Sequence, residues 1–124
     1  MTWNELCRIA QETVERTRAR LPATLREPAE RVPVTFEPFP TPAMLTDEDV
    51  EPDILGLFIG SDLGPAGGGG DSLPPQILLF LENLWDHVDG DPVGFRDEVR
   101  ITYLHELGHF FGWGEEDLEQ RGLE

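Results

Sequence analysis

The sequence predicts an α+β fold in a single domain that spans residues 1–124. Three observations lead to this prediction. The N-terminal residues follow the period of an amphipathic helix, short apolar runs of strand length come next, and a long helical pattern lies near the C-terminus. Because the apolar runs do not alternate with long helical patterns, we expect a small hairpin-like or mixed sheet rather than a doubly wound one.

The first helix is predicted over residues 2–20. Thr2 can cap its N-terminus, with Glu5 at the capping-box position, and Pro22 ends it. One face carries a stripe suited to burial, made of Leu6, Ile9, Ala10, Thr13, Val14 and Thr17. We interpret this helix as scaffold, and we expect a short helical turn over residues 25–31 after it.

Three apolar runs are typical of strands. Residues 32–37 alternate in polarity, and Pro33 places this strand at an edge of the sheet. Residues 54–60 form a second run between helix and strand breakers. Residues 76–82 are apolar at consecutive positions, which is typical of a central strand that is covered on both faces.

Two irregular connections separate these strands. Residues 37–53 are rich in proline and acidic residues and are interpreted as a loop, with one helical turn from Thr46. Residues 61–76 contain four consecutive glycines but lack the lysine of a phosphate-binding loop. We interpret the second connection as flexible, and a flap at the rim of a site is one role that it could have.

A long helix is predicted from Asp91, a suitable N-cap, through Pro92 to Phe111. Gly112 is expected to stop it, and a last short helix is expected over residues 115–120. Apolar side chains surround the long helix, so we expect it to be buried; they are Val99, Leu104, Leu107, Phe110 and Phe111.

Composition excludes several classes of partner and site. The formal net charge is −16, and every basic residue is an arginine, so the surface is expected to repel nucleic acid and anionic membranes. Cys7 is the sole cysteine, which excludes an internal disulfide and a cysteine-based zinc site; we interpret it as a buried thiol. The sequence shows no signal peptide and no apolar run long enough for a membrane span, so we expect a cytoplasmic protein.

The most informative residues lie on the predicted long helix. His105 and His109 are four apart, so on a helix they lie about 40° from each other on one face. Two neutral imidazoles at this spacing can hold Zn²⁺, and Glu106 between them can reach a water on the metal. Burial of these polar groups among Leu and Phe is costly unless they have partners. The pattern therefore predicts a zinc site; the alternative is two hydrogen-bonded core histidines.

A third zinc ligand is expected from the residues after the helix. Gly112 permits a left-handed turn that brings the chain back toward the metal, and Glu115 follows three residues later. A carboxylate beside two histidines is typical of catalytic zinc sites. Glu116 and Asp117 are open alternatives, although both also suit the N-terminus of the last helix.

The segment from His105 to Gly112 resembles the active-site helix of zincin metallopeptidases. More narrowly, residues 96–122 are similar to a compact bacterial family of zincin-like metallopeptidases with the motif HExxHxxGxxE. This resemblance implies a minimal zincin-like fold in which a small mixed sheet lies beside the active-site helix, with Zn²⁺ as cofactor and a peptide or protein as substrate. The metzincin third histidine would align with Glu115, but no methionine follows Gly112, so the methionine turn of that group is absent.

The implied mechanism is hydrolysis of a peptide bond by a metal-activated water. His105, His109 and Glu115 would hold Zn²⁺, and Glu106 would act as general base. An edge strand is expected to bind the peptide by strand addition. We expect Tyr103 in the core and His87 at the surface or a helix cap.

The alternative function is that of a zinc-binding zincin-fold protein without significant peptidase activity, which acts as an interaction module. Only 12 residues follow Gly112, which favours this alternative because most zincin clefts are completed by a C-terminal subdomain.

Overall fold

The computed structural model describes residues 1–60 and 74–113. Within these residues it contains four α-helices, one 3₁₀ turn and three strands, which is the α+β fold that the sequence predicts. In chain order the elements are α1 (Trp3–Ala19), α2 (Ala23–Glu30), β1 (Val34–Glu37), η1 (Met44–Thr46), β2 (Gly56–Ile59), β3 (Gln76–Phe80), α3 (Leu81–His87) and α4 (Pro92–Phe110).

The three strands form one mixed sheet in the order β1–β3–β2. Strand β3 pairs in parallel with β1, where Val34 lies opposite Ile77, and antiparallel with β2, where Phe58 lies opposite the same residue. The central position of β3 confirms the prediction from its apolar run, since its last four residues are all buried. Among the described residues, β1 and β2 are the edge strands of the sheet. Pro33 immediately precedes β1, as expected for a residue that cannot donate a hydrogen bond.

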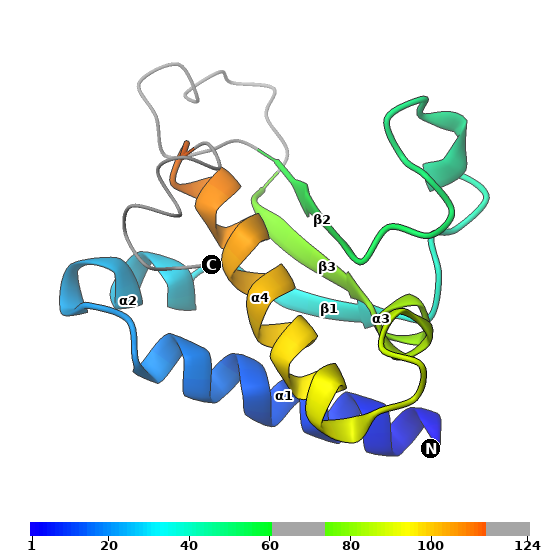
Figure 1. Cartoon of the computed structure of the whole chain (residues 1–124). Coiled ribbons are helices and arrows are strands. Elements are labelled where there is room, and N and C mark those ends of the chain that lie inside the picture. The colour runs from blue at the N-terminus through cyan, green and yellow to red at the C-terminus, as the bar shows by residue number, and fades with distance from the viewer. Residues whose placement is uncertain (61–73, 114–124) are drawn as a thin grey trace.

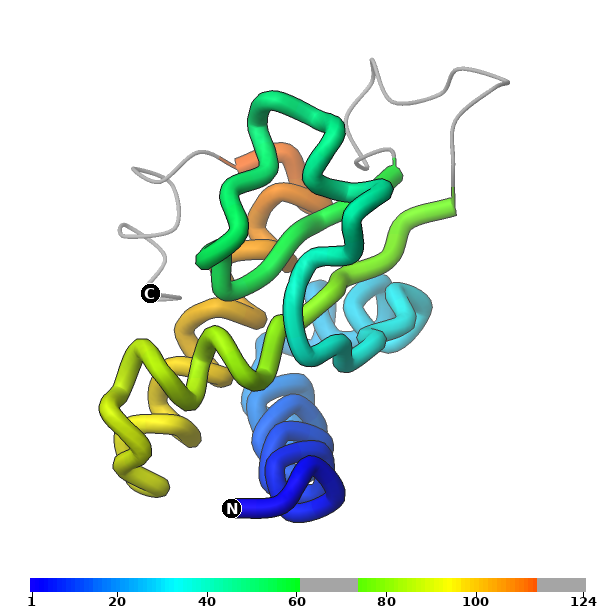
Figure 2. Tube along the Cα trace, turned by 90° about the vertical axis from the view of Figure 1, so that its right-hand side faces the viewer, coloured from blue at the N-terminus to red at the C-terminus, as the bar shows by residue number. Residues whose placement is uncertain are grey.

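Helix α4 lies against β2 and β3, and α1 packs on α4 (Figure 1). The core fills the space between these elements, and it draws on both helices and on β3; its largest fully buried side chains are Tyr103, Phe80, Phe95, Leu6, Ile77, Leu79, Leu81, Leu84 and Leu107. Residues 38–55 form a long connection that lies beyond one end of the sheet in Figure 1 and nearest the viewer in Figure 2. The chain then returns as β2.

Polar contacts at the helix ends and between helices match the sequence pattern. The Thr2 hydroxyl accepts a hydrogen bond from the Glu5 N–H at 3.2 Å and caps α1. Tyr103 is fully buried, as predicted, and its hydroxyl accepts a hydrogen bond from Arg18 Nε at 3.1 Å. This bond ties α1 to α4 where the two helices cross.

The structure corrects three boundaries. Residues 81–87 form the helix α3, although the sequence was interpreted as a strand up to residue 82 and predicted no helix here. The apolar run hid this change because Leu81 and Leu84, three apart, are both buried on one side of the helix. The expected turn at 25–31 is the full helix α2, and the turn expected from Thr46 is η1, which ends there.

Three further predictions concern Cys7, the segments at 61–76 and 115–120, and membrane spans. Cys7 is a free thiol that is half-buried and packs against the core rather than fully within it. The flap predicted within residues 61–76 and the last helix at 115–120 lie outside the described residues, apart from the start of β3. None of the helices in the described ranges is long and apolar enough to cross a membrane.

The N-cap of α4 gives a first test of the fold. The Asp91 carboxylate accepts a hydrogen bond from the Gly94 N–H at 3.2 Å. Asp91→Ala removes this acceptor, so we expect the free energy of unfolding to fall by about 1 kcal/mol. Asp91→Asn is the matched control, because asparagine caps helices about as well as aspartate. Equal losses in both variants in urea unfolding would show that the cap does not contribute.

Candidate metal centre

The three polar residues of the helical motif come together on α4. One ligand atom from each of His105, Glu106 and His109 lies within 4.8 Å of the others. The two imidazole rings are 4.9 Å apart between centroids and nearly perpendicular, at 86°. His109 is exposed, His105 is half-buried and Glu106 is buried. The two imidazoles are therefore accessible to a ligand from solvent, and the buried carboxylate lies close to both of them.

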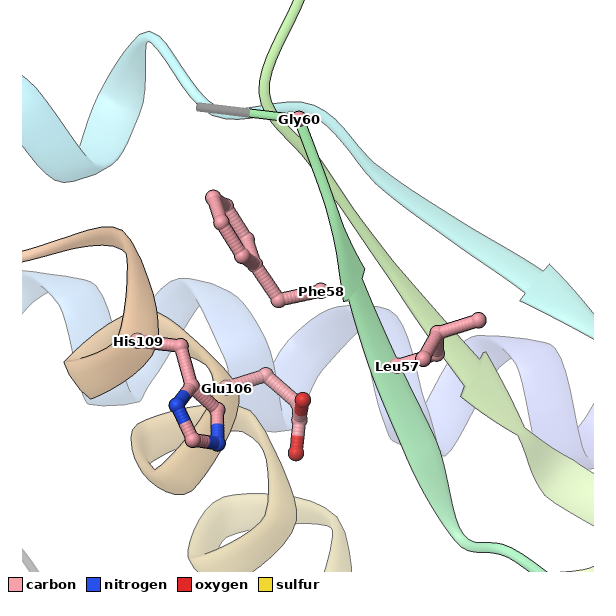
Figure 3. Close-up of a pocket in the computed structure, with 5 residues that line it drawn as sticks. All are labelled: Leu57, Phe58, Gly60, Glu106 and His109. Carbon is pink, nitrogen blue, oxygen red and sulfur yellow. The ribbon is translucent and has the colours of Figure 1, made fainter. Parts of the chain in front are cut away.

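The Glu106 carboxylate lies between α4 and the edge strand β2 (Figure 3). It accepts a hydrogen bond from the backbone N–H of Phe58. Burial raises the pKa of this carboxyl, while the charged forms of His109 and His105 and the Phe58 N–H act to lower it. The group is therefore a buried base whose charged form is stabilised by neighbours rather than by bulk water.

The direction of the Phe58 N–H follows from how β2 pairs with β3. The Leu55 carbonyl accepts a hydrogen bond from the Phe80 N–H at 3.0 Å, so the backbone groups of residue 55 are turned toward β3. Because these groups alternate along a strand in an antiparallel pair, those of Phe58 point to the open edge. That edge faces Glu106.

Gly56 allows β2 to lie this close to α4. A methyl group at Gly56 would lie 2.7 Å from Thr102 Cγ2 and 3.3 Å from Glu106 Cγ, and the first distance is below any ordinary contact. Glycine is required here by proximity to the helix. The strand and the carboxylate are thus positioned against each other.

Two hollows flank Glu106 along β2. One, of about 380 Å³, is lined by Leu57, Phe58, Gly60, Glu106 and His109. The other has a volume of about 340 Å³ and borders His105 and Glu106. Its apolar lining residues include Ile54, Leu55 and Ile101, and Glu98 also lines it. Glu106 borders both, so a chain laid along β2 would pass directly over its carboxylate.

Helix α4 ends as the sequence predicts. Gly112 adopts a φ of 76°, and its N–H donates to the His109 carbonyl at 3.0 Å. The Trp113 N–H donates to the Gly108 carbonyl at 2.9 Å, which completes the hydrogen-bond pattern of a Schellman motif. The chain therefore leaves the helical path at Gly112, three residues after His109. Glu115, Glu116 and Asp117 lie outside the described residues.

His87 is not part of this centre. It is exposed at the end of α3, and its Nε2 lies 3.9 Å from a Glu98 carboxylate oxygen. Phe58 and Gly56 are the functional positions that sequence reasoning missed. Their contribution is a backbone N–H and the absence of a side chain, and neither leaves a signal in a local sequence pattern.

The model of the zincin-like metallopeptidase family matches residues 29–123. The chain belongs to this family. No curated protein matches it. The matched residues contain the whole sheet and α4, so the elements that position His105, Glu106 and His109 are all within the family match.

The donor set of this member of the zincin-like metallopeptidase family fits zinc. Two imidazoles four residues apart on one helical face are nitrogen ligands of the type that Zn²⁺ takes, and they stand beside a carboxylate. The buried carboxylate also explains why a cation is suitable, since Glu106 has a raised pKa and only one N–H donor is identified for it among the described residues.

Gly56 provides a test of how the strand holds the centre. Gly56→Ala forces β2 away from α4, so we expect the free energy of unfolding to fall by about 1–3 kcal/mol. Thr102→Ser removes the methyl group that makes the closest contact. We therefore expect the double variant to recover part of the loss, measured as a coupling energy in a double-mutant cycle. Strict additivity would contradict the close-approach explanation.

Proposed function

We propose that this protein is a zinc-dependent peptidase in which Glu106 acts as general base. The observation that carries the proposal is the grouping of His105, Glu106 and His109 within 4.8 Å, with the carboxylate buried under an open edge strand. Membership of the zincin-like metallopeptidase family supports the same reaction class.

His105 and His109 are the proposed protein ligands of zinc, with Glu115 as the third. Support for the histidines is their shared face on α4 and their nearly perpendicular rings. Support for Glu115 is its position three residues after Gly112, where a left-handed turn ends α4 as the sequence predicts. When bound, zinc supplies a Lewis acid that polarises the scissile carbonyl and makes water a nucleophile near neutral pH.

Glu106 performs the proton transfers. Its carboxylate takes the proton of the attacking water and delivers it to the nitrogen of the leaving amine. The raised pKa that burial gives this carboxyl makes it a better proton acceptor than an exposed glutamate. The Phe58 N–H holds the carboxylate toward the strand side of the centre, where the substrate is expected.

The proposed substrate is an extended peptide or protein segment that adds to the open edge of β2. This edge is free of a strand neighbour within the described residues, and it runs alongside Glu106. Strand addition would align a peptide by main-chain hydrogen bonds and place side chains in the hollows on either side. Because main-chain hydrogen bonds would align the substrate, recognition would depend mainly on its extended backbone rather than on particular side chains.

Glu106→Gln tests the catalytic role. Glutamine keeps the shape of the side chain and can still accept from the Phe58 N–H, so we expect folding and zinc content to stay unchanged. Cleavage of an unfolded protein substrate should fall by about 100-fold or more, because the general base is lost. Asp97→Asn, nine residues earlier and about 180° away around the same helix, is the control for loss of charge and should keep activity. If the wild type and Glu106→Gln are equally inert over a broad peptide library, the interaction-module alternative is favoured.

Metal analysis tests the zinc site. We expect about one equivalent of zinc after expression with added zinc, and a melting temperature that falls on chelation because the metal binds only the folded state. Glu115→Ala should weaken zinc binding by about 100-fold, whereas Glu116→Ala and Asp117→Ala should not. Less than about 0.2 equivalents of any transition metal would end the zinc assignment, and an effect at Glu116 or Asp117 instead would move the third ligand.

A further inference from the structure

Four of the nine arginines line one cavity on the side of α4 that faces α1. The cavity has a volume of about 230 Å³ and is lined by Arg16, Arg20, Arg96 and Arg100, together with Thr13 and Asp97. We call this cavity the arginine cradle. In a chain of net charge −16, it gathers nearly half of all the positive charge in one place.

Among the described residues, few carboxylates neutralise the cradle. Within residues 1–60 and 74–113, the ion pairs of arginine join Arg8 to Glu12 at 3.5 Å and Arg31 to Glu27, and none involves a cradle arginine. The carboxylate of Glu15, one residue before Arg16, accepts a hydrogen bond from Gln11 at 2.8 Å. In the part of the chain that the structure describes, Asp97 is thus the one carboxylate that lines the cavity beside four guanidinium groups.

Helix stability does not explain this arrangement. Arg16 on α1 and Arg20 at its C-cap are four residues apart, and so are Arg96 and Arg100 on α4, so each pair places like charges at a repulsive spacing. Arg16 favours the C-terminal end of α1, but Arg96 lies near the N-terminal end of α4, where a positive charge opposes the helix dipole. The four charges lie together despite these costs, which points to an anionic partner.

The two walls of the cradle are held in place by a fifth arginine. Arg18 donates from Nε to the buried Tyr103 hydroxyl at 3.1 Å, and its guanidinium carbon lies 5.9 Å from the centre of that ring. This contact fixes α1 relative to α4 beside the cavity. The cradle arginines therefore belong to α1, its C-cap and α4 rather than to long loops. Figure 1 shows the crossing of these two helices.

We propose that the arginine cradle binds a phosphate group, either inorganic phosphate or the phosphate of a small ester. Guanidinium groups form paired hydrogen bonds with phosphate oxygens, and a dianion offsets several of them better than one carboxylate does. The guanidinium groups are the donors, because the Thr13 hydroxyl already donates to the Ile9 carbonyl at 2.7 Å. The acidic surface repels large polyanions such as nucleic acid. A single phosphate group is small enough to interact mainly with the positive charge of the cradle.

This site is separate from the proposed catalytic centre. Arg96 and His105 are nine residues apart on α4, which places them about 180° apart around the helix. Zinc at the histidines and phosphate at the cradle would contact opposite faces of the same helix. The proposal therefore stands whether or not the protein cleaves peptides.

Calorimetric titration of the full-length protein with inorganic phosphate tests the proposal, against sodium chloride at matched ionic strength. We expect saturable binding to the wild type that is the same with zinc bound and after chelation. The double variant Arg96→Gln/Arg100→Gln should bind roughly tenfold more weakly or not at all. The double variant Arg8→Gln/Arg31→Gln removes the same charge from two exposed helix pairs elsewhere and should bind like the wild type.

Folding of the variants is not expected to obscure the result, since removing like charges relieves repulsion and the melting temperature should hold or rise. Arg100→Lys keeps the charge but loses the paired hydrogen bonds, and it should weaken binding on its own. Binding no stronger than that of chloride, equal binding by both double variants, or binding that disappears on chelation would each overturn the proposal. The last outcome would place the phosphate at the metal.

Discussion

The hydrogen bond from the Phe58 N–H to the Glu106 carboxylate is the constraint on which the rest of the centre depends. A carboxylate that is buried beside apolar side chains needs donors, and this one finds its backbone donor on a different element of the fold. The bond requires β2 to approach α4 closely. Gly56 makes that approach possible, since any side chain there would meet Thr102.

The same bond couples the register of the sheet to the chemistry of the helix. Backbone groups alternate in direction along β2, so a slip of one residue against β3 would turn the Phe58 N–H away from Glu106. Strand β3 is buried along nearly all its length and pairs on both sides, which fixes that register. The buried centre of the sheet thereby orients a donor at its open edge, and the carboxylate gains a fixed position.

Sequence reasoning predicted the parts of this arrangement that are encoded locally. The caps at Thr2 and Asp91, the end of α4 at Gly112 and the shared face of His105 and His109 all depend on residues within one turn of each other. Helix α3 was missed because Leu81 continues the apolar run of β3 and periodicity cannot separate a short strand from the start of a buried helix. Phe58 and Gly56 were missed because their roles arise from an approach between elements far apart in sequence.

Helix α4 packs against several other elements, so the places where it carries polar side chains indicate where ligands could bind. It contacts α1, α3, β2 and β3, so its sides face different neighbours. Two groups of its polar side chains lie on different sides: the motif toward β2, and Arg96 with Arg100 toward α1. One group offers electron pairs to a cation and the other offers donors to an anion. Because a rigid helix separates them, each can be occupied without contact with the other.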